Sequence, residues 1–248
     1  MDVSPLLNPA PSVPRWRDFA LYLGVGFSAF LLATLVVGAA IQQSGSGLIL
    51  AIGLANFISL AGTVYVIGLR GKRLTLAELG LWPVKWKWSW LILIISVTVL
   101  LLPIRVILAL AALILVEGGL DSLQGRSDLL MPGLSWPNFL ASLIAIGLLA
   151  PIAEELFFRG ALFGWLRRRF ALWAAVLMSA ALFGLAHFDS VGVMISSFIM
   201  GVAIALVYDA TQSLWTAIAI HAFNNSLAVS LAYLALLLLK LFPQLRTP

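Results

Sequence analysis

The chain has 248 residues, of which 62% are hydrophobic and only 10% are charged, and its mean hydropathy is +1.07. Soluble domains carry about 25% charged residues, so this composition excludes a water-soluble domain and predicts a protein that is solvated by lipid. The absence of cysteine excludes thiol chemistry, and the net charge of +5 does not indicate a nucleic-acid partner, because the basic residues cluster beside apolar segments.

Residues 1–18 are rich in proline and polar side chains, and the apolar run that follows is long enough to span a bilayer, so we expect no cleaved signal. About 20 apolar residues cross the hydrocarbon. Of the apolar segments, the first four and the last meet that length, and we expect the shorter fifth and sixth to tilt or to pack as a helical hairpin. The segments are 19–41, 47–69, 88–116, 138–165, 172–187, 191–208 and 214–239.

This pattern predicts an all-α, polytopic transmembrane helix bundle with about seven spans, in a single membrane domain over residues 1–248. An eighth helix forms if the last segment breaks or if residues 74–81 fold as an amphipathic helix. We find no internal repeat and no low-complexity segment in the sequence.

The charges between the segments predict the orientation. Basic residues precede the first span, fill the loop 70–87 and follow the fourth span at 167–169, whereas the loop 117–128 is mainly acidic. The positive-inside rule then places the N-terminus in the cytoplasm, and we expect an integral protein of the cell inner membrane. All nine tryptophans lie at or just outside segment ends, which is typical of an interfacial aromatic belt.

The most informative residues are Glu154 and Glu155, because a carboxylate in the hydrocarbon costs at least ~2.5–3.5 kcal/mol and both lie within an apolar segment. Residues four apart share a helix face, so Glu155 is predicted to pair with Arg159. Glu154 points about 100° away and is left for another task. Pro151 is expected to kink the helix just before the two carboxylates. The alternative is a simple salt bridge near a helix end.

The two histidines also lie in apolar segments. His187 ends the fifth segment, where a lone histidine is more often interfacial or a satisfied core residue. His221 and Asn225 are four apart and face the same way, and Asn224 is the weaker candidate because it points about 100° away. The alternative for this pair is hydrogen bonding between helices.

The depths of these residues along their helices are similar enough for them to meet in one cavity. At 1.5 Å per residue, Glu154 lies about 18 Å, His187 about 24 Å, His221 about 12 Å and Asn225 about 18 Å from the cytoplasmic ends. A cavity that joins them supports two mechanisms for activating water. Glu154 acts as a general base, or Glu154, His187 and His221 hold a zinc-type metal with one open position. In both, Asn225 donates to the oxyanion.

The order Glu-Glu-x-x-x-Arg, Phe-x-x-x-His and His-x-x-x-Asn over residues 138–230 resembles the CPBP family. This family contains the type II CAAX prenyl endopeptidases and the bacterial Abi and bacteriocin-processing relatives. The resemblance implies that residues 138–230 form the catalytic core. It makes Glu154 the water-activating glutamate with His187 as its partner, His221 the second histidine, and Asn225 the oxyanion stabiliser. Glu155 and Arg159 support them. Both the metal-dependent and the metal-free mechanism are compatible with the family.

We therefore expect an intramembrane endopeptidase that cuts near the C-terminus, or in the membrane-proximal part, of a lipid-anchored or membrane peptide. CAAX-type substrates of this family are prenylated, and its partners here would be such a peptide and the lipid bilayer. The competing functions are a transporter or proton relay, which also concentrates intramembrane charges, and a non-enzymatic bacteriocin-immunity protein. Arg105, within the third segment, is expected either to neutralise an acidic cavity or to extend toward an interface.

Overall fold

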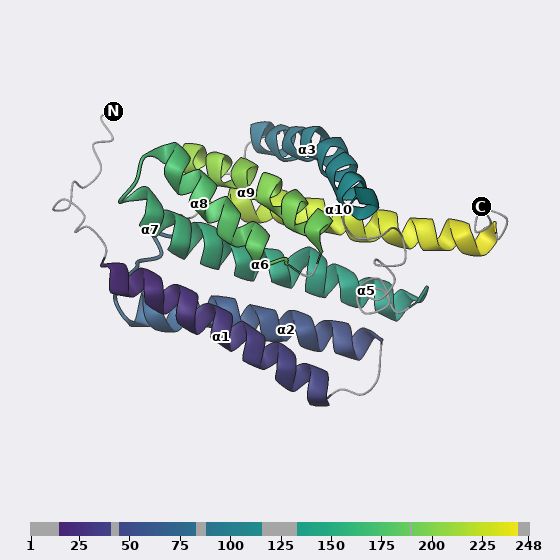
Figure 1. The fold of residues 1–248 in the computed structure, drawn as a ribbon, viewed down its shortest axis with the longest axis horizontal. Coiled ribbons are helices and arrows are strands. Elements are labelled where there is room, and N and C mark those ends of the chain that lie inside the picture. Colours follow the sequence, from purple (N-terminus) through teal and green to yellow (C-terminus); the bar gives the residue numbers. More distant parts are fainter. Residues whose placement is uncertain (1–14, 41–44, 83–87, 116–132, 189, 243–248) are drawn as a thin grey trace.

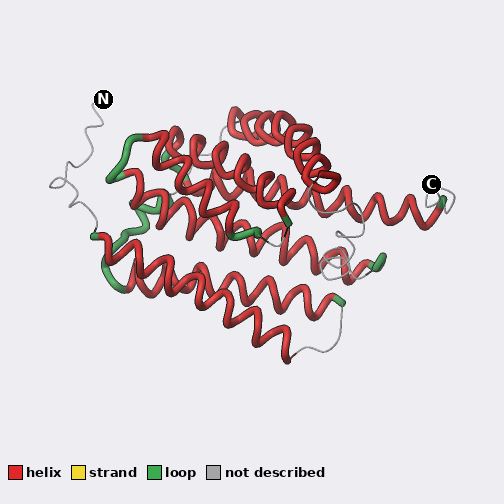
Figure 2. The backbone as a smooth tube through the Cα atoms, viewed as in Figure 1, coloured by secondary structure: helices red, strands yellow, loops and turns green. Residues whose placement is uncertain are grey.

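A computed structural model describes residues 15–40, 45–82, 88–115, 133–188 and 190–242. Within these residues every regular element is a helix, as the colours of Figure 2 show. Six helices are long and apolar enough to cross a membrane, and a seventh apolar helix, α8, is shorter. The prediction of an all-α polytopic bundle of about seven spans is confirmed.

The elements follow the predicted segments closely, with α for α-helices and η for π-helical segments. Two predicted segment ends, at residues 41 and 116, lie outside the described residues. The elements are α1 (Trp16–Ala40), α2 (Ser46–Thr63), η1 (Val64–Arg70), α3 (Trp88–Leu115), α5 (Trp136–Ile144), η2 (Ala145–Leu149), α6 (Ala150–Glu155), η3 (Leu156–Phe163), α7 (Gly164–Arg167), α8 (Leu172–Leu185), α9 (Val191–Thr211) and α10 (Leu214–Leu241).

The centre of the molecule is one long helix, in which α5, η2, α6, η3 and α7 follow each other without a break over Trp136–Arg167. In Figure 1 it runs between α1 and α2 on one side and α8, α9 and α10 on the other. The contacts agree, because this helix packs against α2, α8 and α10. Its residues therefore face neighbours on opposite sides, which places the two carboxylates of α6 in the interior.

Small residues bring neighbouring helices close together. A side chain at Gly53 of α2 would collide with Ala145 of the central helix, and one at Gly201 of α9 would press on Ala180 of α8. Such contacts are common where lipid provides no hydrophobic drive for helix association. The expected hairpin of the fifth and sixth segments is present as α8 and α9. However, α9 runs on to Thr211 and is long enough to span.

Neither route to an eighth helix is taken. The last segment forms α10 without interruption over Leu214–Leu241. Residues 76–80 form turns, and they end at Gly80, whose φ of 70° is accessible mainly to glycine. The Gly80 carbonyl accepts a hydrogen bond from the Leu214 amide at 3.1 Å, so this turn holds the start of α10.

The basic segments gather at one end of the bundle. The Trp165 indole donates to the Arg15 carbonyl at 3.1 Å, and the ion pairs Arg73–Asp18, Arg167–Asp209 and Arg168–Glu78 join further segments there. Trp165 is only 1% exposed, because its ring packs under Trp16 and Phe19.

Candidate active site

The two glutamates of α6 point in different directions, as predicted. The Arg159 guanidinium donates to Glu155 Oε1 at 3.0 Å, and both side chains are fully buried. Glu154 faces elsewhere and is 9% exposed. Its Oε1 accepts a hydrogen bond from the Asn56 amide of α2 at 3.3 Å. The Glu155 carboxylate is thus part of an ion pair, whereas the Glu154 carboxylate accepts a hydrogen bond from a neutral amide.

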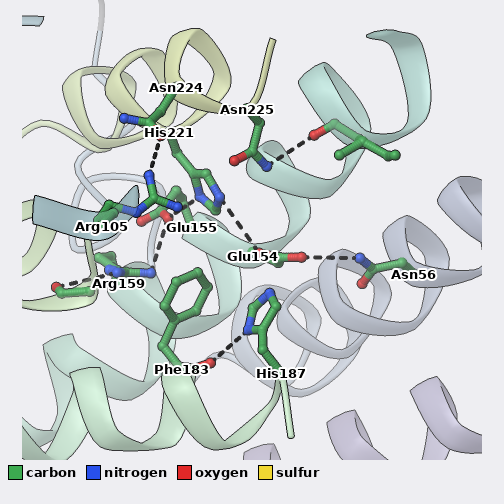
Figure 3. Close-up of polar contacts among 12 residues, drawn as sticks. Asn56, Arg105, Glu154, Glu155, Arg159, Phe183, His187, His221, Asn224 and Asn225 are labelled. Atoms are coloured by element: carbon green, nitrogen blue, oxygen red, sulfur yellow. Dashed lines mark hydrogen bonds and ion pairs between the residues drawn. The ribbon is translucent and has the colours of Figure 1, made fainter. Parts of the chain in front are cut away.

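His221 lies between the two carboxylates, as Figure 3 shows. Its Nδ1 is 2.7 Å from Glu155 Oε1, and its Nε2 is 3.8 Å from Glu154 Oε2. An ionised carboxylate only accepts hydrogen bonds, so Nδ1 carries a proton and Nε2 is directed toward Glu154. Glu155 thereby fixes the tautomer and the orientation of the His221 imidazole.

Phe183 of α8 connects His187 to this cluster. Its ring is fully buried and contacts both imidazoles, with centroid separations of 5.0 Å to His187 and 5.6 Å to His221. The Arg159 guanidinium lies over the same ring, 4.4 Å from its centroid. The face of the Phe183 ring therefore stabilises the buried Arg159 cation, and the ring lies between the two histidines.

His187 lies in the turn just after α8 and is half-buried. Its Nδ1 is 2.9 Å from the Phe183 carbonyl, which only accepts, so Nδ1 is the donor in this hydrogen bond. Among the described contacts no hydrogen bond or ion pair joins His187 to Glu154, and the Phe183 ring contacts His187 and His221. The structure thus brings His187 to the cluster without a direct bond.

Asn225 is positioned by a defect in the central helix. Pro151 has no N–H, and the Ala150 amide bonds to Ala145 in the π-helical pattern, so the nearby carbonyls lose their usual donors. Asn225 Nδ2 donates to the Ile146 carbonyl at 3.1 Å. The neighbouring Ser226 hydroxyl reaches the Gly147 carbonyl at 3.5 Å. The structure thus has a π-helical segment just before Pro151, and side chains of α10 bind its freed carbonyls, whereas the kink expected there stays a prediction.

Sequence reasoning missed Asn56 and did not identify the partners of Arg105. Asn56 is a half-buried amide in an apolar span, and its polarity at that position is the signal that marks such residues as functional candidates. Arg105 of α3 donates to Ser196 of α9 and to Asn224 of α10. Its charge within the third span was visible in the sequence, but its partners lie 91 and 119 residues away.

The comparisons with known proteins cover the part of the chain that holds this cluster. Residues 136–227 match the model of a family described as type II CAAX prenyl endopeptidase Rce1-like. The chain therefore carries an Rce1-like segment. It is also 31% identical over 87 residues to a protein of Bacillus subtilis (strain 168) named "Putative membrane peptidase YdiL". That match covers 35% of this chain and 35% of the relative's length. No solved structure matches.

The Rce1-like segment contains Glu154, His187, His221 and Asn225, together with the Glu155–Arg159 pair. Asn56 and Arg105 lie outside it, on α2 and α3. The cluster is thus completed by helices from the N-terminal half of the chain, where the sequence motifs had predicted no site residue.

The cluster offers fewer converging ligands than a zinc centre requires. Among the described residues no three His, Cys, Asp or Glu side chains come close enough to hold a metal ion. Glu154 and His221 approach each other, but His187 is turned to its own helix through Nδ1. Because three protein ligands are the usual minimum, this arrangement does not fit a zinc centre. The predicted set of Glu154, His187 and His221 stays a prediction.

Proposed function

We propose that this protein is an intramembrane endopeptidase of the Rce1-like type, in which Glu154 activates water. It hydrolyses a peptide bond near the C-terminus, or in the membrane-proximal part, of a lipid-anchored or membrane peptide, as in CAAX processing. The observation that carries the proposal is the Glu155–His221–Glu154 arrangement. An imidazole held by one carboxylate at 2.7 Å directs its other nitrogen toward a second carboxylate, that of Glu154, at 3.8 Å.

The chemistry follows from these groups. Glu154 removes a proton from a water molecule, and the water oxygen attacks the carbonyl carbon of the scissile bond. The carbonyl oxygen becomes an oxyanion. As the tetrahedral intermediate collapses, the C–N bond breaks and Glu154 returns its proton to the leaving amine. One water is consumed, and two peptides leave.

The remaining side chains orient and stabilise the reacting atoms. His221 presents Nε2 to the water beside Glu154, held in place by Glu155 and, through it, Arg159. Asn225 uses one amide N–H on the Ile146 carbonyl, and we assign its second N–H to the oxyanion. Within the described part of the chain the only hydrogen bond of the His187 ring is that of Nδ1, and we assign its Nε2 to proton transfer with Glu154.

The membrane setting agrees with such a substrate. Among the described residues six helices are long and apolar enough to span, and Glu154 and Glu155 lie within one of them, Trp136–Arg167, so a bond cut there lies within or beside the bilayer. We propose that the basic end of the bundle faces the cytoplasm, with the N-terminus on that side and the protein in the cell inner membrane. Comparison of prenylated with unmodified peptides tests whether the protein recognises a prenyl group.

The test is cleavage of a peptide library, prenylated and unmodified, followed by mass spectrometry. We expect the wild type to cut at a single position and Glu154→Gln to lose about 10²-fold or more of the rate, as expected for loss of a general base. Glu78→Gln is the matched control, because Glu78 is a carboxylate in an exposed ion pair with Arg168. Equal rates for the wild type and Glu154→Gln would refute the assignment of Glu154.

A chelator arm separates the two predicted mechanisms. Hydrolysis by Glu154 alone continues at an unchanged rate after extensive chelation. A rate that collapses on chelation and returns with added zinc would instead assign Glu154, His187 and His221 as metal ligands.

A further inference from the structure

Arg105 is a second cation among the packed helices, in addition to Arg159. It lies on α3, and Figure 3 shows its side chain directed toward α10. Its Nε donates to the Ser196 hydroxyl of α9 at 2.7 Å, and its Nη1 donates to the Asn224 side-chain oxygen. Asn224 is ten residues from the start of α10, so this contact lies about 15 Å along that helix, near the middle of a span.

Both partners of Arg105 are neutral. Within the described residues no carboxylate forms an ion pair with it, in contrast to Arg159, which has Glu155. An unpaired charge at this depth is costly, and intramembrane charges mark binding or transport sites when they occur. Ser196 and Asn224 accept hydrogen bonds from two N–H groups of Arg105. However, a neutral side chain could link α3 to α9 and α10 without the cost of placing a charge in the membrane. The charge therefore requires a function beyond joining α3 to its neighbours.

The surroundings of Arg105 have more hydrogen-bond donors than acceptors. A guanidinium has five N–H groups, and its described hydrogen bonds go to two acceptors. Asn224 is 2% exposed, and its Nδ2 is a buried donor that finds no acceptor in the described part of the chain. A carboxylate supplies the missing negative charge, and its two oxygens match the planar fork of a guanidinium.

The position relates this anion site to the reacting bond. Asn224 follows His221 by three residues on α10, and residues three apart are neighbours on a helix surface. Arg105 is therefore held beside the helix turn that carries His221 and Asn225. An extended peptide spans about 3.3–3.6 Å per residue, so a carboxylate bound at Arg105 belongs to a residue only a few positions beyond the scissile bond.

We propose that Arg105 binds the C-terminal α-carboxylate of the substrate peptide. This inference rests on the proposed peptidase function and makes it more specific: the substrate has a free C-terminus a few residues after the cut. Arg105 is a positioning and specificity residue, because it holds the end of the chain and not the reacting atoms.

The experiment compares matched peptides that differ only in ending as a free acid or as a C-terminal amide. We expect the wild type to prefer the acid by about 10- to 100-fold in kcat/KM, mainly through KM, which is the range for a charge-assisted hydrogen bond. In Arg105→Gln the ratio of acid to amide falls to about one, and Arg105→Lys keeps part of the preference. Arg167→Gln, which removes an arginine from the exposed pair with Asp209, keeps the full preference.

A binding arm separates this inference from the peptidase proposal. Binding of the acid and amide peptides to the wild type and to Arg105→Gln is measured in detergent, with the thermal midpoint as the check on folding. If nothing is cleaved but the acid binds preferentially through Arg105, the peptidase proposal fails and the anion site stands. Equal treatment of acid and amide by the wild type, or an equal loss of both in Arg105→Gln, would overturn the anion site.

Discussion

At the scale of single residues, Glu155 connects two functions. Its Oε1 accepts from Arg159 at 3.0 Å and from His221 Nδ1 at 2.7 Å, all in the fully buried interior. Removing one member of a buried ion pair leaves an uncompensated charge, whereas replacing both members by apolar residues is often neutral. Stability and histidine orientation can therefore be separated by substitution.

Replacing Glu155 alone by Met should lower the free energy of unfolding by about 3–5 kcal/mol, because Arg159 then stays buried without its partner. The double variant Glu155→Met, Arg159→Met should recover most of that stability. Its hydrolysis should still fall about 10- to 100-fold, since His221 has lost the group that orients it. Unfolding in detergent and kcat are measured together. A double variant with the wild-type kcat would show that His221 does not depend on Glu155.

At the scale of elements, the central helix and α10 are joined where the helix is defective. Pro151 and the π-helical segment η2 deprive two carbonyls of donors, and the side chains of Asn225 and Ser226 bind them. In the hydrocarbon region of the membrane no water is available to donate a hydrogen bond to such carbonyls. Asn225 therefore has a structural role in addition to its proposed role at the oxyanion.

A double-mutant cycle tests this link. Asn225→Ala should cost about 1–3 kcal/mol of stability, because it leaves the Ile146 carbonyl unsatisfied. Pro151→Ala restores a backbone N–H, so the same substitution should cost less in that background. The control is Thr211→Ala, whose hydroxyl binds only within its own helix, to the Val207 carbonyl. Strictly additive effects for Asn225 and Pro151 would rule out the proposed compensation.

At the scale of the whole molecule, the basic segments lie at one end, and the start of the central helix at Trp136 lies at the other. Because the natural chain has no cysteine, single cysteines report on each end without background. Ala77 and Trp136 are both exposed and mark the two ends.

Labelling with a membrane-impermeant thiol reagent should modify Ala77→Cys only from the cytoplasmic side and Trp136→Cys only from the opposite side, following the positive-inside rule. Intact and inverted vesicles are compared. Exchange of the two patterns would reverse the orientation, and modification of both from one side would contradict the arrangement of spans.

Much of the site was predictable because its signals are local. Helical periodicity is sufficient to pair Glu155 with Arg159 and to turn Glu154 away from them. Deeply apolar surroundings identified the carboxylates and histidines as unusual, since intramembrane charges are costly. The same reasoning could have identified Asn56, but an isolated amide is a weaker signal than a charge.

The sequence alone determined the number and approximate limits of the apolar segments and singled out the side chains that we propose for the chemistry, because hydropathy and helix periodicity are properties of neighbouring residues. Only the tertiary structure decided that Glu155 bonds to His221 across 66 residues and that Asn56 reaches Glu154 across 98. It also decided that Arg105 meets Asn224. In lipid all spans are similarly apolar, so which helices meet, and in what rotation, is determined by close packing and specific hydrogen bonds.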